Sequence, residues 1–443
     1  MFSLVTILAL AALPAAPQTP TPQIPPRPIL TLDQALATAN SHQPQLQAAA
    51  ATSLAAQARS DEALAALRPQ VSGIGSYQRA TANFVSRPGA LPRQLGSGSG
   101  GESSQSFGFY DFGLSASYLL YDFGQARDRW RSAEASFESQ RGSERATASQ
   151  VRFAVRTAFF QARAARELVT VADDTLANQR KHLEQTQGFV DVGTQPPIAL
   201  AQAKTAVSNA QVQQINAANG YETAKAQLNQ AMGVEQLTDY DVADDTPPPV
   251  RSEDSSPDAL LGEAIKARPE IAALADQVQS QELLVKALHS AYWPSLGLST
   301  SVTDAGDGIG GGGLTWNASA ALQLSIPIYL GGSTGAQIAE GQANLAVVRS
   351  QLAIERLQVR LEVEQARLAV VAAKSALAAS ADALENARDQ LQLAEGRYET
   401  GVGSIIELGD AQVALTSAAQ QKVQAEYGLA QARAQLVKAL GRD

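Results

Sequence analysis

In the second half of the chain, large side chains recur every seven residues, and small side chains follow three residues later. The large series is Leu377, Leu384, Leu391 and Tyr398, and the small series is Ser380, Ala387 and Ala394. Residues 333–400 contain no proline and are rich in Ala, Leu, Gln and Glu, which is typical of a long helix. The repeat predicts a seam at which a second helix packs closely. The segment from about Ser404 to Leu440 supplies that helix, in an antiparallel hairpin with its tip near Gly401.

The same pattern occurs earlier in the chain. Residues 125–192 also lack proline, and a turn near Gly193 leads into a second alanine-rich segment that ends at Met232. The glycines that bound the first pattern, Gly124, Gly193 and Gly233, lie 208 residues before Gly332, Gly401 and Gly441. We therefore interpret the chain as an internal duplication of one helical hairpin unit.

Each copy also contains a shorter helix and two predicted strands. The helix covers about 32–67 in the first copy, where Pro44 interrupts it, and begins at Asp258 in the second, where Pro269 does so. The period then changes to two, which predicts strands at about 70–80 and 107–121, and at about 294–304 and 314–328. We expect a mainly α fold with a small β part, built from two long helical hairpins.

Apolar and polar side chains alternate along these strands, although glycines blur the pattern in the first one, at 70–78. Such alternation is typical of transmembrane barrels with an apolar outer face and a polar lumen. An amphipathic sheet resting on a soluble core is the alternative. Because single-chain barrels begin at eight strands, four strands would require several chains to share one barrel.

The expected organisation has five segments. They are a signal peptide at 1–16 with an approximate cleavage site, a Pro-rich linker at 17–31, a first repeat at 32–233, an acidic Pro-rich linker at 234–257, and a second repeat at 258–443. The apolar run 2–12 has the length of a signal-peptide core but lacks a basic region before it, so a frayed apolar N-terminus is the alternative. We expect ordered structure to begin at Leu32 and the acidic linker to be solvated.

Composition narrows the function. The chain has no cysteine, which excludes disulfides and thiolate chemistry, and its Lys and Arg residues are scattered at a net charge of −9, which disfavours nucleic-acid binding. We find no nucleophile–base set, metal-spaced carboxylates or cofactor motif. The glycine run 308–313 joins two strands and is therefore interpreted as a hairpin loop rather than a phosphate cradle. We expect neither enzymatic activity nor a metal or other cofactor.

Several short motifs occur twice, in the same order. They are Pro-Gln-Leu at 44–46 and Pro-Glu-Ile at 269–271, the strand exits LLYDFGQ and IPIYLGGS, and the tips VGTQPPIALAQA and TGVGSIIELGDA. With these motifs, nearly everything after Leu32 resembles the outer-membrane efflux protein family, the TolC-like channels of tripartite efflux pumps and type I secretion systems.

This resemblance implies a homotrimer in the outer membrane, with twelve strands in lipid and a twelve-helix periplasmic tunnel. Such a channel would passively conduct substrate from an inner-membrane transporter through a periplasmic adaptor, the membrane fusion protein. A periplasmic adaptor or a coiled-coil scaffold without a pore is the alternative function.

The resemblance also assigns roles to single residues. Glu407 and Asp410 match acidic positions that narrow the periplasmic entrance, although carboxylates also suit the first turn of any helix. Tyr398 matches a tyrosine that latches the closed entrance, or is only the last residue of the heptad seam. Gly403 and Ala199 replace the basic and acidic partners that this tyrosine has in the best-known members. The tip positions that would meet the adaptor, or serve only as turn residues, are Gly193, Thr194, Gly401, Val402, Gly403 and Ser404.

Overall fold

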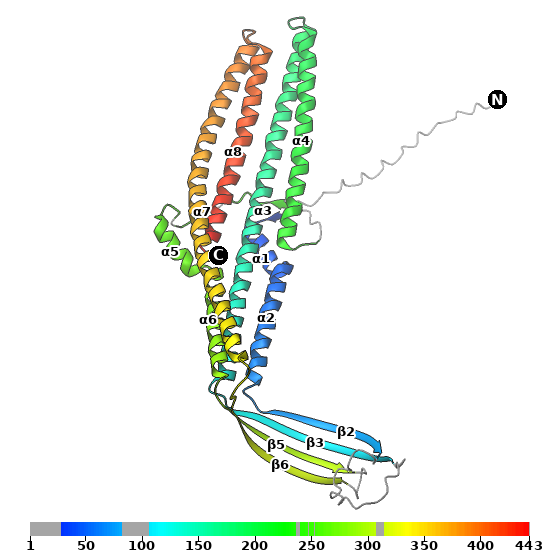
Figure 1. Cartoon of the computed structure of the whole chain (residues 1–443). Helices are drawn as coiled ribbons and strands as arrows, with labels where there is room; N and C mark the ends of the chain where they lie inside the picture. Colours follow the sequence, from blue (N-terminus) through cyan, green and yellow to red (C-terminus); the bar gives the residue numbers. More distant parts are fainter. Residues whose placement is uncertain are drawn as a thin grey trace, which may run out of the picture.

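The two proline-free, alanine-rich segments form the longest helices of the computed structural model. Helices α3 (Gln125–Asp191) and α7 (Ser333–Glu399) each contain 67 residues, and their bounds differ by the 208 residues of the duplication. Each chain segment then turns back into α4 (Pro197–Met232) or α8 (Ile405–Ala439). The result is two long antiparallel hairpins that end side by side at one end of the molecule (Figure 1).

The structure describes residues 28–81, 106–235, 240–246, 248–251, 253–306 and 314–442. In these ranges no helix is both long and apolar enough to cross a membrane. The expected signal peptide at 1–16 and the glycine run 308–313 lie outside the described residues.

Proline divides the shorter helix of each copy in two. The first copy has α1 (Leu32–His42) and α2 (Pro44–Ala65), and the second has α5 (Pro257–Ala267) and α6 (Pro269–Ser290). Pro44 and Pro269 each occupy the first position of the second helix, where a missing N–H costs no hydrogen bond. The break expected at these prolines is confirmed.

Four antiparallel strands form one sheet at the other end of the molecule. They are β2 (Gln70–Thr81), β3 (Ser106–Tyr121), β5 (Ser295–Gly306) and β6 (Leu314–Ser325), in the order β2-β3-β5-β6. The register places Leu114 opposite Val302 on one face. On the other face the hydroxyls of Ser72 and Ser115 lie 2.8 Å apart. The predicted alternation of an apolar and a polar face is confirmed at these positions. The exceptions include Ile74, which lies on the polar face, and Asp304, which lies on the apolar face opposite Phe112 and Trp316.

Helices and strands follow the same lateral order. Near the sheet α2 packs against α3, α3 against α6, and α6 against α7; in the tip half the order is α4, α3, α8, α7. The molecule is therefore a single layer along its whole length (Figure 1). One edge consists of α4, α2 and β2. The other consists of α7 and β6, with α5 packed beside α7 at mid-height (Figure 1).

Between the sheet and mid-height, the two copies meet along α3 and α6, which pack side by side. The Ser132 hydroxyl donates to the Ser280 carbonyl at 2.8 Å, and the Ser280 hydroxyl returns an equal bond to the Ser132 carbonyl. Further along the same contact, a Cβ added at Gly142 would lie 2.8 Å from the Cβ of Ala273. Small residues thus bring the backbones of the two copies together, and buried hydroxyls are satisfied across the contact.

Two short strands correct the expected start of ordered structure. Strand β1 (Ile29–Leu30) pairs in parallel with β4 (Asp241–Val242), so order begins before Leu32. Residues of both expected linkers therefore contribute to one small sheet at mid-height. Val242 is fully buried in the core around α3 and α4. Removing its apolar side chain from water lowers the free energy of the folded chain.

The acidic segment 234–257 is also less solvated than expected. Glu253 is buried and forms ion pairs with Lys374 at 2.7 Å and Arg433 at 3.2 Å. Burial alone would raise the pKa of Glu253, but hydrogen bonds from these two cations hold it below its ordinary value. The sequence predicts that this acidic segment is solvated. In the structure, Glu253 instead anchors it to α7 and α8.

The last predicted strand is too long by three residues. We expected pairing over 314–328, and β6 ends at Ser325. Pro327 has no N–H to donate to a neighbouring strand, and residues 326–330 leave the sheet toward α7.

The contact between α3 and α6 predicts the sign of the change in stability when a methyl group is added to a glycine. Gly142→Ala should destabilise the protein by about 1–3 kcal/mol, because the added methyl overpacks the contact with Ala273. On the same helix, nothing lies within 4 Å of a Cβ added at Gly188. Gly188→Ala should therefore be neutral or stabilising by up to about 1 kcal/mol. Denaturant unfolding of the detergent-solubilised variants measures both, and equal effects at the two sites would contradict the close approach.

Candidate functional site at the helical tips

The two hairpin tips have the same backbone design. Gly193 and Gly401 adopt left-handed φ values of 76° and 75°. The Phe189 carbonyl accepts from Thr194 N at 3.0 Å, and the Arg397 carbonyl accepts from Val402 N at 3.0 Å. These bonds satisfy the helix ends and leave the tips largely exposed, with Gln195 and Gly403 half-buried. Ser404 then caps α8, because its hydroxyl accepts from Glu407 N at 3.1 Å.

Below the tips, a seam joins the two hairpins of one chain. We define the inter-hairpin seam as the contact of α3 and the first tip with α7 and α8. The hydroxyls of Thr175 and Thr416 lie 3.2 Å apart, and Gln179 Nε2 donates to Gln412 Oε1 at 2.9 Å. Neutral polar side chains thus hold the hairpins together here, with bonds of modest net strength.

Tyr398 is the centre of the upper part of this seam. Its ring is 4% exposed and meets the rings of His182 and Phe189 edge to face, with centroids 5.3 and 5.9 Å away. Its hydroxyl accepts a hydrogen bond from Gln195 Nε2 at 2.8 Å and lies 3.5 Å from the Thr186 hydroxyl. Tyr398 is therefore both the last heptad residue of its own hairpin and a residue that contacts four side chains of the other one.

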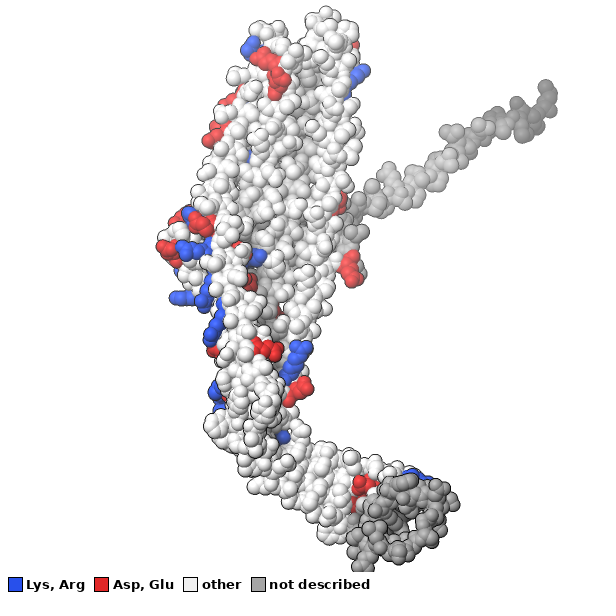
Figure 2. Space-filling model, in the orientation of Figure 1, with Lys and Arg blue, Asp and Glu red and all other residues white. Residues whose placement is uncertain are grey.

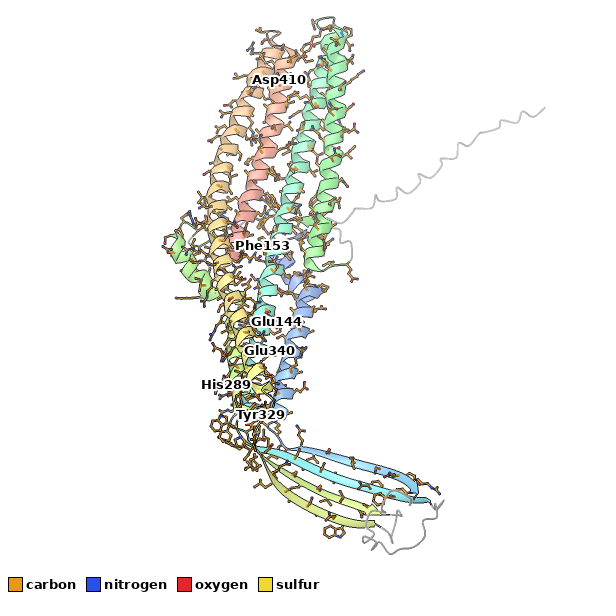
Figure 3. All side chains as sticks on the ribbon, viewed as in Figure 1. Glu144, Phe153, His289, Tyr329, Glu340 and Asp410 are labelled. Carbon is orange, nitrogen blue, oxygen red and sulfur yellow. The ribbon has the colours of Figure 1, made fainter. Side chains whose placement is uncertain are left out.

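The acidic pair behaves less symmetrically than the sequence suggests. Glu407 Oε1 lies 3.1 Å from Arg397 Nη1, in a half-exposed ion pair within the second hairpin. Asp410 is exposed on α8 close to the tip, and no ion pair or hydrogen bond to its carboxylate occurs among the described residues (Figure 3). The side chain with the free charge is thus Asp410, whereas Glu407 shares its charge with a neighbour.

A cavity of about 390 Å³ lies in the lower seam between α3, α7 and α8. Its walls combine leucines with amide and charged side chains from both hairpins, including Gln179, Leu384 and Lys422. Within the described residues, no group of three or more His, Asp or Glu side chains is placed to hold a metal ion.

Comparison with known proteins identifies the family. The model of the family described as outer membrane efflux protein matches residues 35–234 and 260–442, most of both repeats. The chain belongs to the outer membrane efflux protein family. Its location is therefore the outer membrane, with the helical hairpins as a large periplasmic part, and its class is that of efflux channels.

Individual members of this family share a quarter or so of their sequence with the chain. The outer membrane efflux protein BepC of Brucella suis biovar 1 (strain 1330) is 28% identical over 244 residues, which are 54% of this chain and 51% of that protein. The solvent efflux pump outer membrane protein SrpC of Pseudomonas putida is 25% identical over 336 residues, 75% of this chain and 71% of that protein. The match thus spans about half the length of BepC.

Solved family structures share the fold. The outer-membrane channel OprN superposes with a TM-score of 0.78 at 20% identity, covering 93% of this chain and 90% of that one. The Campylobacter jejuni CmeC outer membrane channel gives 0.78 at 18% identity, covering 93% of this chain and 85% of that one.

Sequence reasoning identified Tyr398 but missed its partners. Gln195, whose amide reaches the Tyr398 hydroxyl, stands 208 residues before Gly403, so the duplication offered a signal: an amide in one tip where the other has glycine. His182, Thr186 and Phe189 follow helical spacing and share one face of α3. The expected acidic partner position, Ala199, is apolar and buried.

The Tyr398–Gln195 bond can be measured with a double-mutant cycle. Tyr398→Phe and Gln195→Ala should show a coupling energy of about 0.5–1.5 kcal/mol in denaturant unfolding, because each removes the same hydrogen bond. Thr194→Ala is the matched control, since the Thr194 hydroxyl donates to the Phe189 carbonyl instead. If the coupling energy of Tyr398→Phe with Gln195→Ala is no larger than that of Tyr398→Phe with Thr194→Ala, the hydrogen bond does not contribute to stability.

Proposed function

We propose that three copies of the chain close into one channel, which passively conducts substrate from the periplasm to the outside and performs no chemistry. An inner-membrane transporter and a periplasmic adaptor would supply the energy and the connection. The open edges of the single layer are the observation that carries this proposal.

The sheet has two edges that its own chain does not pair. In the order β2-β3-β5-β6, strands β2 and β6 each have a neighbour on one side only. Unpaired N–H and C=O groups are costly in lipid, so a membrane sheet must close on itself. Pairing β6 of one copy with β2 of the next closes the sheet, and three copies would give the twelve strands implied by the family.

The helical edges support the same arrangement. Val359 of α7 is buried against α5 and α6, and Leu361, two residues later, lies on nearly the opposite side of the helix. That opposite side carries an exposed heptad series: Val347, Ile354, Leu361 and Leu368. The outer side of α2 is exposed and lined by Ala48, Ala51, Ala55 and Ala58. Large side chains on one edge and alanines on the other are suited to close packing between copies.

The surface of the sheet supports placement in lipid. Its visible face in Figure 2 is almost free of Lys, Arg, Asp and Glu. At the junction with the helices, Phe123 stacks on Trp293 at 5.2 Å and meets Tyr121 edge to face at 4.9 Å, and all three rings are exposed. Aromatic side chains of this kind favour the boundary between hydrocarbon and headgroups. They would mark the periplasmic limit of the membrane.

The cargo we propose is small organic molecules rather than secreted proteins. The relatives that carry a functional name are described as solvent, toluene or antibiotic efflux pump proteins. The polar face of the sheet, which would line the lumen, bears mainly uncharged groups, such as the paired hydroxyls of Ser301 and Ser319. A neutral polar wall passes diverse small solutes without binding any of them tightly.

The tips would form the periplasmic entrance. Three Asp410 side chains and three Glu407 side chains would make two acidic rings, of which the Asp410 ring carries more unshared charge. Gly193, Thr194, Gly401, Val402, Gly403 and Ser404 would meet the adaptor with exposed backbone.

Conductance of the purified protein in a planar bilayer tests this function. We expect cation-selective channels, and Glu407→Gln with Asp410→Asn should lower the cation-over-anion permeability ratio several-fold by removing charge at the narrowest point. Asp410→Asn alone should have the larger share of this effect. Glu385→Gln with Asp389→Asn, two exposed carboxylates further from the tip on α7, is the control of equal charge. Protein that inserts but does not conduct would instead support the scaffold alternative.

A further inference from the structure

His182 occupies an unusual place for a titratable side chain. It lies on α3 inside the inter-hairpin seam, 7% exposed, with its ring edge to face against Tyr398. Its Nδ1 atom is buried and has no hydrogen-bond partner. An imidazole at this site is thus held by packing alone, in contact with the residue on which the upper seam is centred.

Among the described residues, no charged side chain compensates a charge on His182. The charged residues beside it in sequence on α3 are Arg180, Lys181 and Glu184. On the packed elements the charged residues next to Tyr398 and the tip are Glu395 and Arg397 on α7, and Glu407 and Asp410 on α8; Gln195, at the first tip, is neutral. The side chain of Glu407 is half-exposed, and the other charged side chains are exposed to solvent. His182, in contrast, is buried against Tyr398. Burial is the cause that lowers the pKa of His182, with no ionic neighbour acting on it.

We propose that His182 makes the inter-hairpin seam a pH-sensitive clasp, packed when the imidazole is neutral and released when the imidazole is protonated. A proton on buried Nδ1 would add an N–H donor and a charge to a site that offers neither an acceptor nor a counter-ion. Separation of the hairpins returns the imidazolium to water. Tyr398 loses its packing partner in the same step, and with it the contact that aligns its hydroxyl with Gln195.

The direction of the effect follows from linkage. The pKa of His182 is lower in the packed seam than in a separated one, where it approaches the ordinary value of 6.5. The packed seam is therefore at full strength above about pH 6.5 and weakens as the pH falls below that value. One proton per chain changes the ratio of separated to packed seams by at most about tenfold per pH unit.

The Tyr398 ring offers partial compensation to an imidazolium through a cation–π contact. The rings meet at 64° with centroids 5.3 Å apart, so this contact can form at little structural cost. Burial acts in the opposite direction and lowers the pKa of His182. The pH dependence of the seam measures the balance of the two effects.

Thiol accessibility reads the seam directly in this cysteine-free chain. Thr186 is fully buried beside the Tyr398 hydroxyl, so the maleimide reaction of Thr186→Cys reports separation. Leu393→Cys, 70% exposed on α7, corrects for the pH dependence of thiol reactivity. The rate ratio of the two thiols should rise as the pH falls from about 7.5 to 5.5, by up to about tenfold per pH unit below 6.5.

Two substitutions at His182 decide the outcome. His182→Gln places here the residue that the second copy has at the equivalent position, Gln390, and His182→Phe keeps an aromatic ring without a titratable group. Both should abolish the rise in the rate ratio. His289→Gln, far away near the sheet (Figure 3), should leave the rise unchanged. A wild-type ratio that does not rise, or a rise that survives both His182 substitutions, would overturn the proposal.

If the protein is the proposed channel, opening of the seam would widen its periplasmic entrance, and this consequence rests on the proposed function. The thiol reaction rates report seam opening whether or not the protein is a channel. If the thiol rates show that the seam opens at low pH but the open probability of the channel is the same at both pH values, the clasp exists and does not gate the channel. A seam that opens in protein without any conductance would instead contradict only the channel.

Discussion

Close contact between α3 and α6 is the constraint on which the rest of the structure depends. Hydroxyls of Ser132 and Ser280 exchange hydrogen bonds across it, and Gly142 admits Ala273 at a distance that a methyl group would close. Because the contact is lateral, the two copies lie edge to edge instead of stacking face to face. The described residues consequently bury their apolar side chains in several separate clusters and form one layer with two open edges.

The duplication gives the two hairpins one backbone design, and a few substitutions give them different tasks. Phe189 and Arg397 accept the same turn bonds at positions 208 residues apart. Val190 in the first copy corresponds to Tyr398 in the second, and Gln195 corresponds to Gly403. These differences place an aromatic ring in one hairpin and its amide partner in the other, so the seam depends on the loss of symmetry between copies.

Much of the fold could be predicted because its signals are periodic. The seven-residue series ending at Tyr398 predicted a close seam, and Ser380, Ala387 and Ala394 are indeed buried in it. The alternation around Leu114 and Val302 predicted the two faces of the sheet. Single contacts between distant segments carry no such period. The pairing of Ile29 with Asp241, and the burial of Glu253 between Lys374 and Arg433, depend on tertiary neighbours that composition conceals.

The candidate site divides in the same way. The tips and their capping residues follow local rules, and Tyr398 could be located by its heptad position. Its partners could not, because His182, Thr186 and Gln195 reach it from the other copy, across more than 200 residues of sequence. The roles of Glu407, Asp410 and the tip residues depend on neighbouring copies and on the adaptor, and they stay predictions.

Cross-linking between the open edges tests the central claim most directly. Ala51 on α2 and Val347 on α7 are exposed and lie about four turns from the sheet end of their helices. With cysteines at both positions and a short bis-maleimide, membranes should give covalent dimers and then closed trimers, with no larger species. Either single-cysteine variant should give none. Ladders that extend beyond three chains, or no cross-link in membranes that contain the protein, would contradict closure of the layer by three copies.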